Sequence, residues 1–367
     1  MTSSPYAYID KHALKHNFDH LKAISGQAKV MCAVKGNAYG HSIVDTTNIL
    51  TEADGFAVAR LSEAKILRDL GIDRPITLLG GFTTTEELRV AIDLRCDIVI
   101  HNITQIELLE NTTTPKISIS SWLKIDTGMN RLGIKITDVF DAISRLESMN
   151  IIAKFGLMTH LSDAEDKKSK KNSIQLDLFK GLTDHFSGDI SFANSAVIVN
   201  YDELIKDYKW NNKGDIWIRP GIALYGISPL ADISAKQLNL KPVMQFVSKL
   251  IAIRPILKGE CVGYNSTWVA KKDSTLGVVS VGYGDGYSKS IISGGPVVVN
   301  GRKVPLVGLV SMDLIAVDLG SNTDDYIGDE VILWGEQLPV EEVAHYSNLT
   351  SYALVTGVSE RVERRIH

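Results

Sequence analysis

Cysteines, long apolar segments and an excess of one charge are scarce or absent in this 367-residue sequence. The three cysteines, Cys32, Cys96 and Cys261, are too few and too irregularly spaced for a disulfide framework or a zinc site. The opening residues, MTSSPYAYIDKH, contain no basic region followed by an apolar stretch, so we expect no signal peptide. No apolar run reaches the roughly 18 residues of a membrane-spanning helix. We therefore expect a protein of the reducing cytoplasm.

The charges are nearly balanced, with 39 Lys and Arg against 43 Asp and Glu and a net charge of −4. This balance gives no reason to expect nucleic acid or an anionic membrane as a partner, although a local cluster of donors can still bind a small anion. Hydrophobic residues make up 44% and charged residues 22%, which is typical of a globular protein. At roughly 100–200 residues per domain, the length predicts one to three domains.

The first 230 or so residues alternate short apolar runs with segments of helical periodicity. Helices are expected at 61–70, 85–94, 104–110 and 139–149, with Thr84 and Thr137 at helix starts and the basic run 166–171 as a solvated helix start. Strands alternating with helices predict an α/β fold, and eight such units predict a closed (β/α)8 barrel of the TIM type. The eight expected strands are 30–34, 55–59, 76–79, 97–100, 117–125, 155–160, 190–193 and 216–218.

The pattern changes near residue 235, where β-branched runs such as VMQFVSKLIAIRPIL begin. Asn300-Gly301 lies between two apolar runs, which is the strongest short signal for a β-hairpin. The polar linker 231–242 marks the expected boundary. We predict a barrel over 1–235 and a mainly antiparallel β domain over 236–367, with the first ten or so residues pairing with the β domain.

Lys35 closes the first expected barrel strand, in the segment KVMCAVKGNAYGHS. The C-terminal ends of barrel strands carry the active site in this fold. A lysine with a depressed pKa at such a position is suited to forming a Schiff base. The alternative is a lysine that extends to the barrel rim, and spacing alone favours that alternative.

Other polar groups follow later strands. Lys124, Asp126 and Arg131 surround a glycine turn, where a salt-bridged loop is the alternative to a functional role. His160 and Asp163 follow the next strand, and an isolated histidine there is more often structural.

The last two strand ends carry a serine and a glycine turn. Asn194 and Ser195 follow one strand, and Arg219, Gly221 and Ile222 follow the other. Barrels often bind phosphate in these loops, through backbone N–H groups and hydroxyls. Together with Lys35, these loops suggest a phosphorylated cofactor held by the last strands and bonded to a lysine on the first.

Seven segments resemble the alanine racemase family, in the same order and at similar spacing. AVKGNAYGH resembles the pyridoxal-phosphate signature of that family, and LKIDTGMNRLG resembles its second strong motif. The further segments are ANSA, RPGIALYG, VGYNSTW, VGYGDGY and GLVSMDL, so the resemblance runs from about Tyr8 to Arg365. It implies a barrel with a β domain, pyridoxal 5′-phosphate as cofactor, no metal, and a homodimer that shares its active sites. The implied activity is interconversion of L-alanine and D-alanine through an aldimine of the cofactor, supplying D-alanine for peptidoglycan.

The resemblance also implies residue roles, carried over position by position. Lys35 would bond the cofactor and act as one catalytic base, and Tyr264 of the opposite subunit would be the second base. Arg219 would contact the pyridine nitrogen, and His160 would lie near the cofactor ring. The phosphate would be held by Tyr39, Ser195, Gly221, Ile222 and Tyr352.

The substrate carboxylate would be bound by Arg131, which would also contact the cofactor, and by the backbone N–H of Met312 from the partner subunit. Asp313 would lie beside Met312 in the same loop. Lys124 matches a lysine that is carbamylated in many members. Departures from the common pattern are Gly36, Ser42, Ser311 and Ala353, and the last makes the match at Tyr352 the weakest of the set.

Four other functions are compatible with parts of this pattern. A broad-specificity racemase would carry a signal peptide and a disulfide. A barrel-type decarboxylase of basic amino acids would need a cysteine in the partner loop, which GLVSMDL lacks. A non-catalytic pyridoxal-phosphate-binding barrel would lack the second domain. The remaining alternative is a scaffolding protein.

Overall fold

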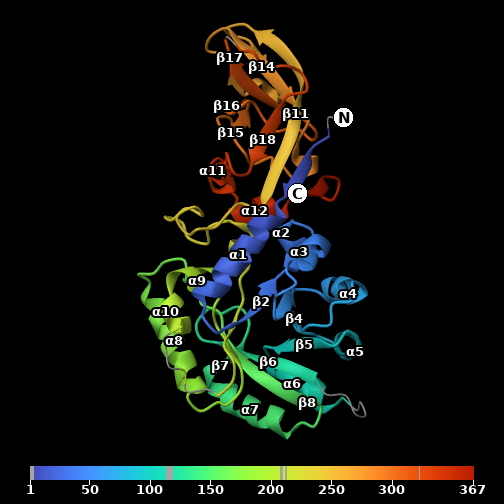
Figure 1. Cartoon of the computed structure of the whole chain (residues 1–367), viewed down its shortest axis with the longest axis vertical. Coiled ribbons are helices and arrows are strands. Elements are labelled where there is room, and N and C mark those ends of the chain that lie inside the picture. Colours follow the sequence, from blue (N-terminus) through green and yellow to red (C-terminus); the bar gives the residue numbers. More distant parts are fainter. Residues whose placement is uncertain (1–3, 113–118, 207–209, 211–212, 322) are drawn as a thin grey trace.

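The protein is described by a computed structural model over residues 4–112, 119–206, 210, 213–321 and 323–367. A helix-covered barrel occupies one end of its long axis and a β-rich domain occupies the other (Figure 1). Strand β11 (Met244–Ile256) runs from the junction of the two parts into the β domain (Figure 1). The predicted succession of a barrel and a β domain is therefore confirmed.

Eight parallel strands form the barrel in the described part of the chain, paired in the order β10-β2-β3-β4-β5-β6-β8-β9. Bridges from Ile190 to Ile216 and from Asn194 to Arg219 close the ring. Each predicted strand is present with its ends shifted by a few residues, although 117–118 lie outside the described residues. The eight strands are β2 (Lys29–Ala33), β3 (Gly55–Val58), β4 (Ile76–Leu78), β5 (Cys96–Ile100), β6 (Ile119–Asp126), β8 (Ile152–Met158), β9 (Ile190–Ser191) and β10 (Trp217–Ile218).

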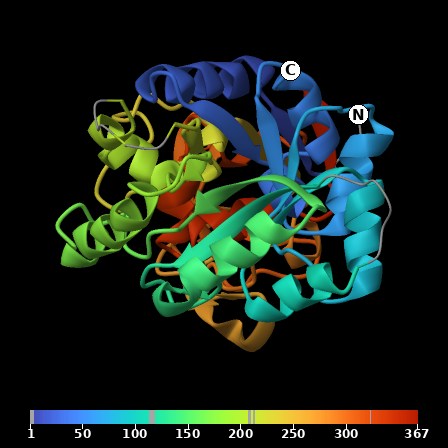
Figure 2. The ribbon, with the colours of Figure 1, turned by 90° about the horizontal axis from the view of Figure 1, so that it is seen from below.

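Helices surround the barrel strands, as the view from below shows (Figure 2). Side chains cap several of them, as when Thr84 Oγ1 accepts the N–H of Glu87. The expected start at Thr137 is wrong, because a 3₁₀ turn (Ile136–Asp138) comes first and the Thr137 hydroxyl donates to Asp138 instead. The helices are α1 (Lys11–Ile24), α2 (Lys35–Tyr39), α3 (Ile43–Ile49), α4 (Leu61–Asp69), α5 (Thr85–Asp93), α6 (Ile103–Glu110), α7 (Val139–Ser148), α8 (Lys170–Thr183), α9 (Ser195–Asn200) and α10 (Asp202–Lys206).

The barrel interior is filled by large side chains. Trp122 and Trp217 meet edge to face, with ring centroids 6.1 Å apart. Met31, Val99 and Met158 pack around the two indoles. Because this core leaves no open channel, a ligand site has to lie at an end of the barrel rather than inside it.

The C-terminal domain is a mainly antiparallel sheet that curls onto itself, because β11 pairs with both β14 and β18. Asn300 and Gly301 form its predicted hairpin with φ of 48° and 74°. Strand β1 (Tyr6–Ile9) also belongs to this sheet, between β11 and β19. The other elements are β7 (Ile134–Lys135, beside β6), β12 (Cys261–Val262), β13 (Trp268–Val269), β14 (Ser274–Val279), β15 (Pro296–Val299), β16 (Arg302–Val307), β17 (Ile315–Gly320), β18 (Glu330–Trp334), α11 (Val340–Ala344), α12 (Ser351–Thr356) and β19 (Glu363–Ile366).

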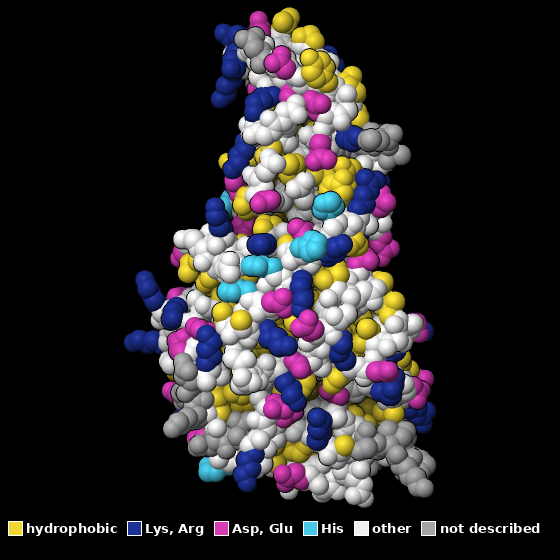
Figure 3. All heavy atoms as spheres, in the orientation of Figure 1, with side chains coloured by type: hydrophobic (Ala, Val, Ile, Leu, Met, Phe, Trp, Pro, Cys, Tyr) yellow, Lys and Arg dark blue, Asp and Glu magenta, His cyan; other side chains and the backbone are white. Residues whose placement is uncertain are grey.

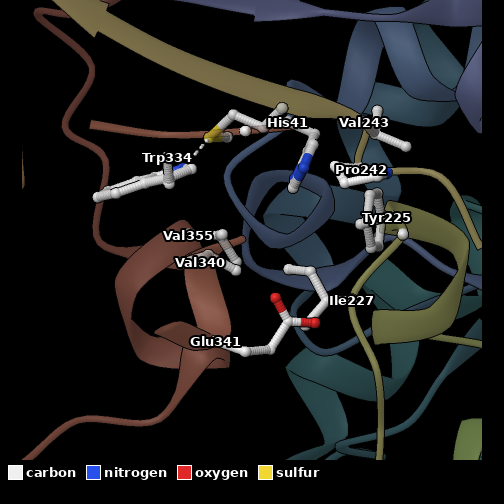
Figure 4. Close-up of a pocket in the computed structure, with 12 residues that line it drawn as sticks. His41, Tyr225, Ile227, Pro242, Val243, Trp334, Val340, Glu341 and Val355 are labelled. Atoms are coloured by element: carbon white, nitrogen blue, oxygen red, sulfur yellow. Dashed lines mark hydrogen bonds between the residues drawn. The ribbon is translucent and has the colours of Figure 1, made fainter. Parts of the chain in front are cut away.

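His41 lies in the seam between the two domains, beside a small cavity (Figure 4). Its ring stands 4.5 Å from that of Tyr225, and Trp334 and Val355 approach from the β domain. Nδ1 of His41 hydrogen-bonds the carbonyl of Tyr39 at 2.9 Å, which makes Nδ1 the protonated nitrogen. The other nitrogen, Nε2, is buried without a hydrogen-bond partner in the described part of the chain. The seam is therefore tightly closed around a neutral imidazole.

The surface carries charges of both signs. Lys and Arg side chains are interspersed with Asp and Glu on the face drawn in Figure 3. Across the described residues, helices are too short or too polar to cross a membrane.

Candidate active site

A cavity of about 540 Å³ opens at the C-terminal end of the barrel strands. This volume lies within the range of small-molecule sites. Ten of the residues predicted from the sequence line it: Lys35, Tyr39, Lys124, Arg131, His160, Ser195, Arg219, Gly221, Ile222 and Tyr352. Three predicted residues, Tyr264, Met312 and Asp313, do not line it.

Lys35 enters the cavity from an unusual backbone turn. Gly36, Asn37, Ala38 and Tyr39 all adopt the left-handed conformation, with φ between 52° and 63°. Such a conformation costs about 1–2 kcal/mol for each non-glycine residue, so the surroundings must hold it. Asn37 Oδ1 accepts the N–H of Ile43 at 2.8 Å, and the N–H of Ala38 donates to Val34 O at 2.8 Å. Strain of this kind is concentrated at functional sites, and here it directs both Lys35 and Tyr39 to the cavity.

Four cationic side chains meet in this cavity: Lys35, Lys124, Arg131 and Arg219. Burial and then the charge of Arg131 lower the pKa of Lys35 from its ordinary value. Burial, followed by Arg219 and Arg131, lowers the pKa of Lys124 to about 8. The site therefore attracts anions and holds lysines that lose their protons more easily than lysines in water.

Arg219 is fixed at the base of the cavity and is only 7% exposed. Its guanidinium donates to the carbonyl of Thr159 at 2.7 Å and to the hydroxyl of Ser191. Its burial lowers its pKa to about 10, so it remains charged at neutral pH. His160 Nδ1 lies 3.4 Å from Arg219, and burial together with the nearby cations lowers the His160 pKa to about 3. A permanent cation therefore stands beside a neutral imidazole.

The turn after β10 forms a cradle with Ser195. Ser195 Oγ accepts the N–H groups of Gly221 at 2.8 Å and Ala223 at 3.3 Å, so its own O–H is left to donate. A Cβ on Gly221 would lie 2.6 Å from the Tyr39 hydroxyl, which shows how closely Tyr39 approaches the turn. The ring of Tyr352 lies 6.3 Å from that of Tyr39. Hydroxyl donors thus converge beside a backbone turn, an arrangement suited to a phosphate.

The β-domain residues Tyr264 and Met312 lie on two different surface loops, one between β12 and β13 and the other between β16 and β17. Tyr264 is 70% exposed and Met312 is 54% exposed. The carbonyl of Met312 accepts the N–H of Gly284 at 2.9 Å, and Arg361 donates to Asp313 at 2.6 Å and to Asp285 at 2.7 Å. Met312 and Asp313 are thus held by their neighbours, and neither they nor Tyr264 line this chain's own cavity.

Some residues that shape the site carried no sequence signal. Ser191 and Thr159 hold Arg219. Because single hydroxyl residues are common within or after apolar strands, the sequence does not single these two out. Glu63 reaches the loop that follows Lys35. Glu63 lies in the first turn of α4, where a glutamate commonly caps its own helix, so the sequence alone does not reveal this contact.

The fold and the cavity define a barrel enzyme whose cavity brings a lysine together with a serine–glycine turn, and an antiparallel β domain is attached to the barrel. The chain matches the profile of the alanine racemase N-terminal domain over residues 9–229 and that of the C-terminal domain over 243–366. It belongs to the alanine racemase family, whose members are pyridoxal-phosphate-dependent racemases. The predicted resemblance is thereby confirmed.

Individual relatives agree over the full length. The chain is 44% identical to an alanine racemase of Shewanella sediminis, with 99% of both chains covered. It is 44% identical to that of Pasteurella multocida, covering 97% of this chain and 96% of the relative. Among solved structures, it is similar to the biosynthetic alanine racemase of Pseudomonas aeruginosa, with a TM-score of 0.93, 38% identity and 99% of both chains covered. The alanine racemase of Acinetobacter baumannii gives a TM-score of 0.89 at 35% identity, again with 99% of both chains covered.

Proposed function

We propose that this chain interconverts L-alanine and D-alanine with pyridoxal 5′-phosphate bound in the barrel cavity, and supplies D-alanine for peptidoglycan. The observation that carries the proposal is the convergence of Lys35, Arg219 and the Ser195–Gly221 cradle in one cavity. Full-length similarity to alanine racemases supports the choice of substrate.

The residues present fit this cofactor. Lys35 offers an amine that loses its proton easily, and the cradle offers donors for a phosphate. Lys35 would hold the cofactor covalently, and Tyr39, Ser195, Gly221, Ile222 and Tyr352 would hold its phosphate. Arg219 would meet the ring nitrogen and His160 the ring. When bound, the cofactor makes the proton on the α-carbon of the substrate acidic by delocalising the charge left behind.

Racemisation needs one base on each face of the α-carbon. Lys35 would move the proton at its Nζ on one face, helped by the lowered pKa of its amine. Tyr264 would move the proton at its phenolic oxygen on the other face. Because Tyr264 lies outside the cavity lining and is 70% exposed, we propose that it acts in the cavity of a second chain. The working enzyme would then be a homodimer with shared sites.

The remaining residues would bind the substrate and tune the site. Arg131, on the cavity wall, would pair with the substrate carboxylate and contact the cofactor. Met312 of the second chain would give its backbone N–H to the same carboxylate, with Asp313 beside it. Lys124 would carry a carbamate that positions Arg131.

We also propose the chain's division and location. The barrel would comprise 1–235 and the β domain 236–367, with β1 contributed to the β domain, as its pairing with β11 supports. The three cysteines are free thiols, which supports a reducing cytoplasm.

Circular dichroism tests the activity directly. Purified protein with pyridoxal phosphate is incubated with L-alanine, and in parallel with L-serine, L-lysine and L-arginine, with Lys35→Ala as the control. Rapid loss of optical activity from alanine, absent in the control, is the expected result. If alanine stays optically pure while another amino acid racemises or loses carbon dioxide, the fold and cofactor survive but the substrate is wrong.

A further inference from the structure

Glu63 lies at the start of α4 and connects two neighbouring loops at the C-terminal end of the barrel. One carboxylate oxygen, Oε2, accepts the N–H groups of Ala59 at 2.8 Å and Arg60 at 3.1 Å. These bonds cap its own helix. The other oxygen, Oε1, accepts the N–H of Gly36 at 2.6 Å. Gly36 directly follows Lys35, so one side chain joins a helix cap to the loop that carries the cavity lysine.

The bond to Gly36 acts where the backbone most needs support. Gly36 is the first residue of the left-handed turn. Its N–H lies two residues before that of Ala38, which donates to the carbonyl of Val34. A charged acceptor makes a stronger hydrogen bond than a neutral one, and it fixes both the position and the direction of this peptide. The Glu63 carboxylate is also the negative charge that opposes the lowering of the Lys35 pKa by burial and by the nearby arginines.

We propose that Glu63 is a positioning residue for Lys35, which it orients in the cavity by holding the Gly36 amide. The proposal rests on the proposed racemase function, because the value of a fixed lysine lies in proton transfer at its Nζ. A displacement of about 1 Å at a reacting group can reduce turnover about 100-fold.

Glu63→Gln removes the charge and keeps the size, and Glu87→Gln is the matched control. Glu87 stands in the first turn of the next helix, α5, and accepts the N–H and hydroxyl of Thr83, both at 2.7 Å. It lies outside the cavity lining. Both variants should lose similar thermal stability. Only Glu63→Gln should lower kcat for alanine, by about 10-fold or more, with little change in KM.

The second readout uses cofactor-free protein and does not depend on turnover. Lys35 is labelled with an amine-reactive reagent across a pH series, and the labelled peptide is quantified by mass spectrometry. Loss of the Glu63 charge should make labelling faster near pH 8, because Glu63 opposes the lowering of the Lys35 pKa and without it a larger share of the amine is neutral. Glu63→Asp keeps the charge but shortens the reach, so its labelling profile should match the wild type while kcat still falls.

The outcomes separate a positioning role for Glu63 from a role as a helix cap alone. If Glu63→Gln and Glu63→Asp lose only the stability that Glu87→Gln loses, with unchanged labelling and kcat, Glu63 is a helix cap and the proposal is wrong. If the wild type does not racemise alanine, the proposed function is wrong, and the labelling comparison still decides whether the charge of Glu63 acts on the Lys35 amine. If Glu63→Gln fails to fold, Glu63→Asp supplies the same test of kcat.

Discussion

The barrel and the β domain present their proposed functional residues in opposite ways. The barrel directs Lys35, His160 and Arg219 inward to one cavity, where burial changes their pKa values. The β domain displays Tyr264 and Met312 at the surface, with 70% and 54% of each exposed. The barrel thus forms most of the cavity, to which the β domain adds Tyr352, whereas Tyr264 and Met312 of the β domain lie outside the cavity lining of their own chain.

The loop that carries Met312 and Asp313 is nevertheless held by its neighbours. Arg361 ties Asp313 to the buried Asp285, and the backbone of Gly284 holds Met312. A Cβ on Gly282 would lie 2.3 Å from the Met312 carbonyl, so the two loops are in close backbone contact. Exposed residues can therefore still be held in one position, which is what the proposed binding of this loop to a second chain would require.

Mixed dimers test this division most severely. Lys35→Ala and Tyr264→Phe should each reduce alanine racemisation by about 10²- to 10⁴-fold as homodimers, because each removes one base. A purified dimer with one variant in each chain has one intact site, if the base comes from the partner. It should recover about half of the wild-type activity. Recovery is measured with two affinity tags and the circular dichroism assay. No recovery would mean that each chain uses its own tyrosine.

Acid should weaken the seam between the domains. The pKa of His41 is lowered by burial to about 4 from the ordinary 6.5, so the unfolded chain takes up a proton before the folded chain does. Stability should therefore fall as the pH drops below 6.5 toward 4, by about 3 kcal/mol from this residue. His41→Asn keeps a donor for the Tyr39 carbonyl and should remove this part of the loss, while His160 supplies a further part.

Urea unfolding between pH 7 and pH 4.5 measures the effect of His41. His12→Asn on α1 is the control, because that histidine is exposed. An equal acid loss in the wild type and in His41→Asn would contradict the assignment.

A single added methyl group, in Gly221→Ala, should weaken binding of pyridoxal phosphate without disturbing the fold of the barrel. The Cβ of Gly221→Ala would approach the Tyr39 hydroxyl, which is the free end of a side chain and can move aside. The fold should survive, and the affinity for pyridoxal phosphate should fall about 10-fold through loss of one hydrogen bond to a charged group. Fluorescence titration measures the affinity. Tyr39→Phe should cost a similar amount, and the double variant should cost much less than the sum. Additive losses would place Tyr39 away from the phosphate.

Lys124 should show the smallest effect. With a pKa of about 8, about a tenth of its amine is neutral at pH 7, and only the neutral form reacts with carbon dioxide. Carbon NMR with labelled bicarbonate should show a carbamate signal that weakens as the pH falls below 7 and is absent in Lys124→Arg. That variant should lose a few-fold in activity, in line with a residue that acts on Arg131. A signal that persists in Lys124→Arg would assign the carbamate to another lysine.

Much of this architecture could be predicted from the sequence. The barrel strands are buried on both faces and are therefore short, continuous apolar runs, which can be recognised in the sequence. The helix start expected at Thr137 is wrong, because a hydroxyl before a periodic run does not reveal that a 3₁₀ turn precedes the helix. The left-handed turn after Lys35 could not be predicted, because Asn37, Ala38 and Tyr39 carry no local preference for that conformation strong enough to specify it. Contacts from distant segments, such as the bond from Glu63, hold it there.

The placement of β1 determines the order in which the molecule can be completed. Tyr6–Ile9 is translated before both of its partners, β11 (Met244–Ile256) and β19 (Glu363–Ile366). At 5–20 residues per second, the first strand waits on the order of tens of seconds for its last neighbour. The growing chain therefore carries β1 without either of its partners while the whole barrel is being made, and a change within Tyr6–Ile9 will affect a sheet whose other strands are translated much later.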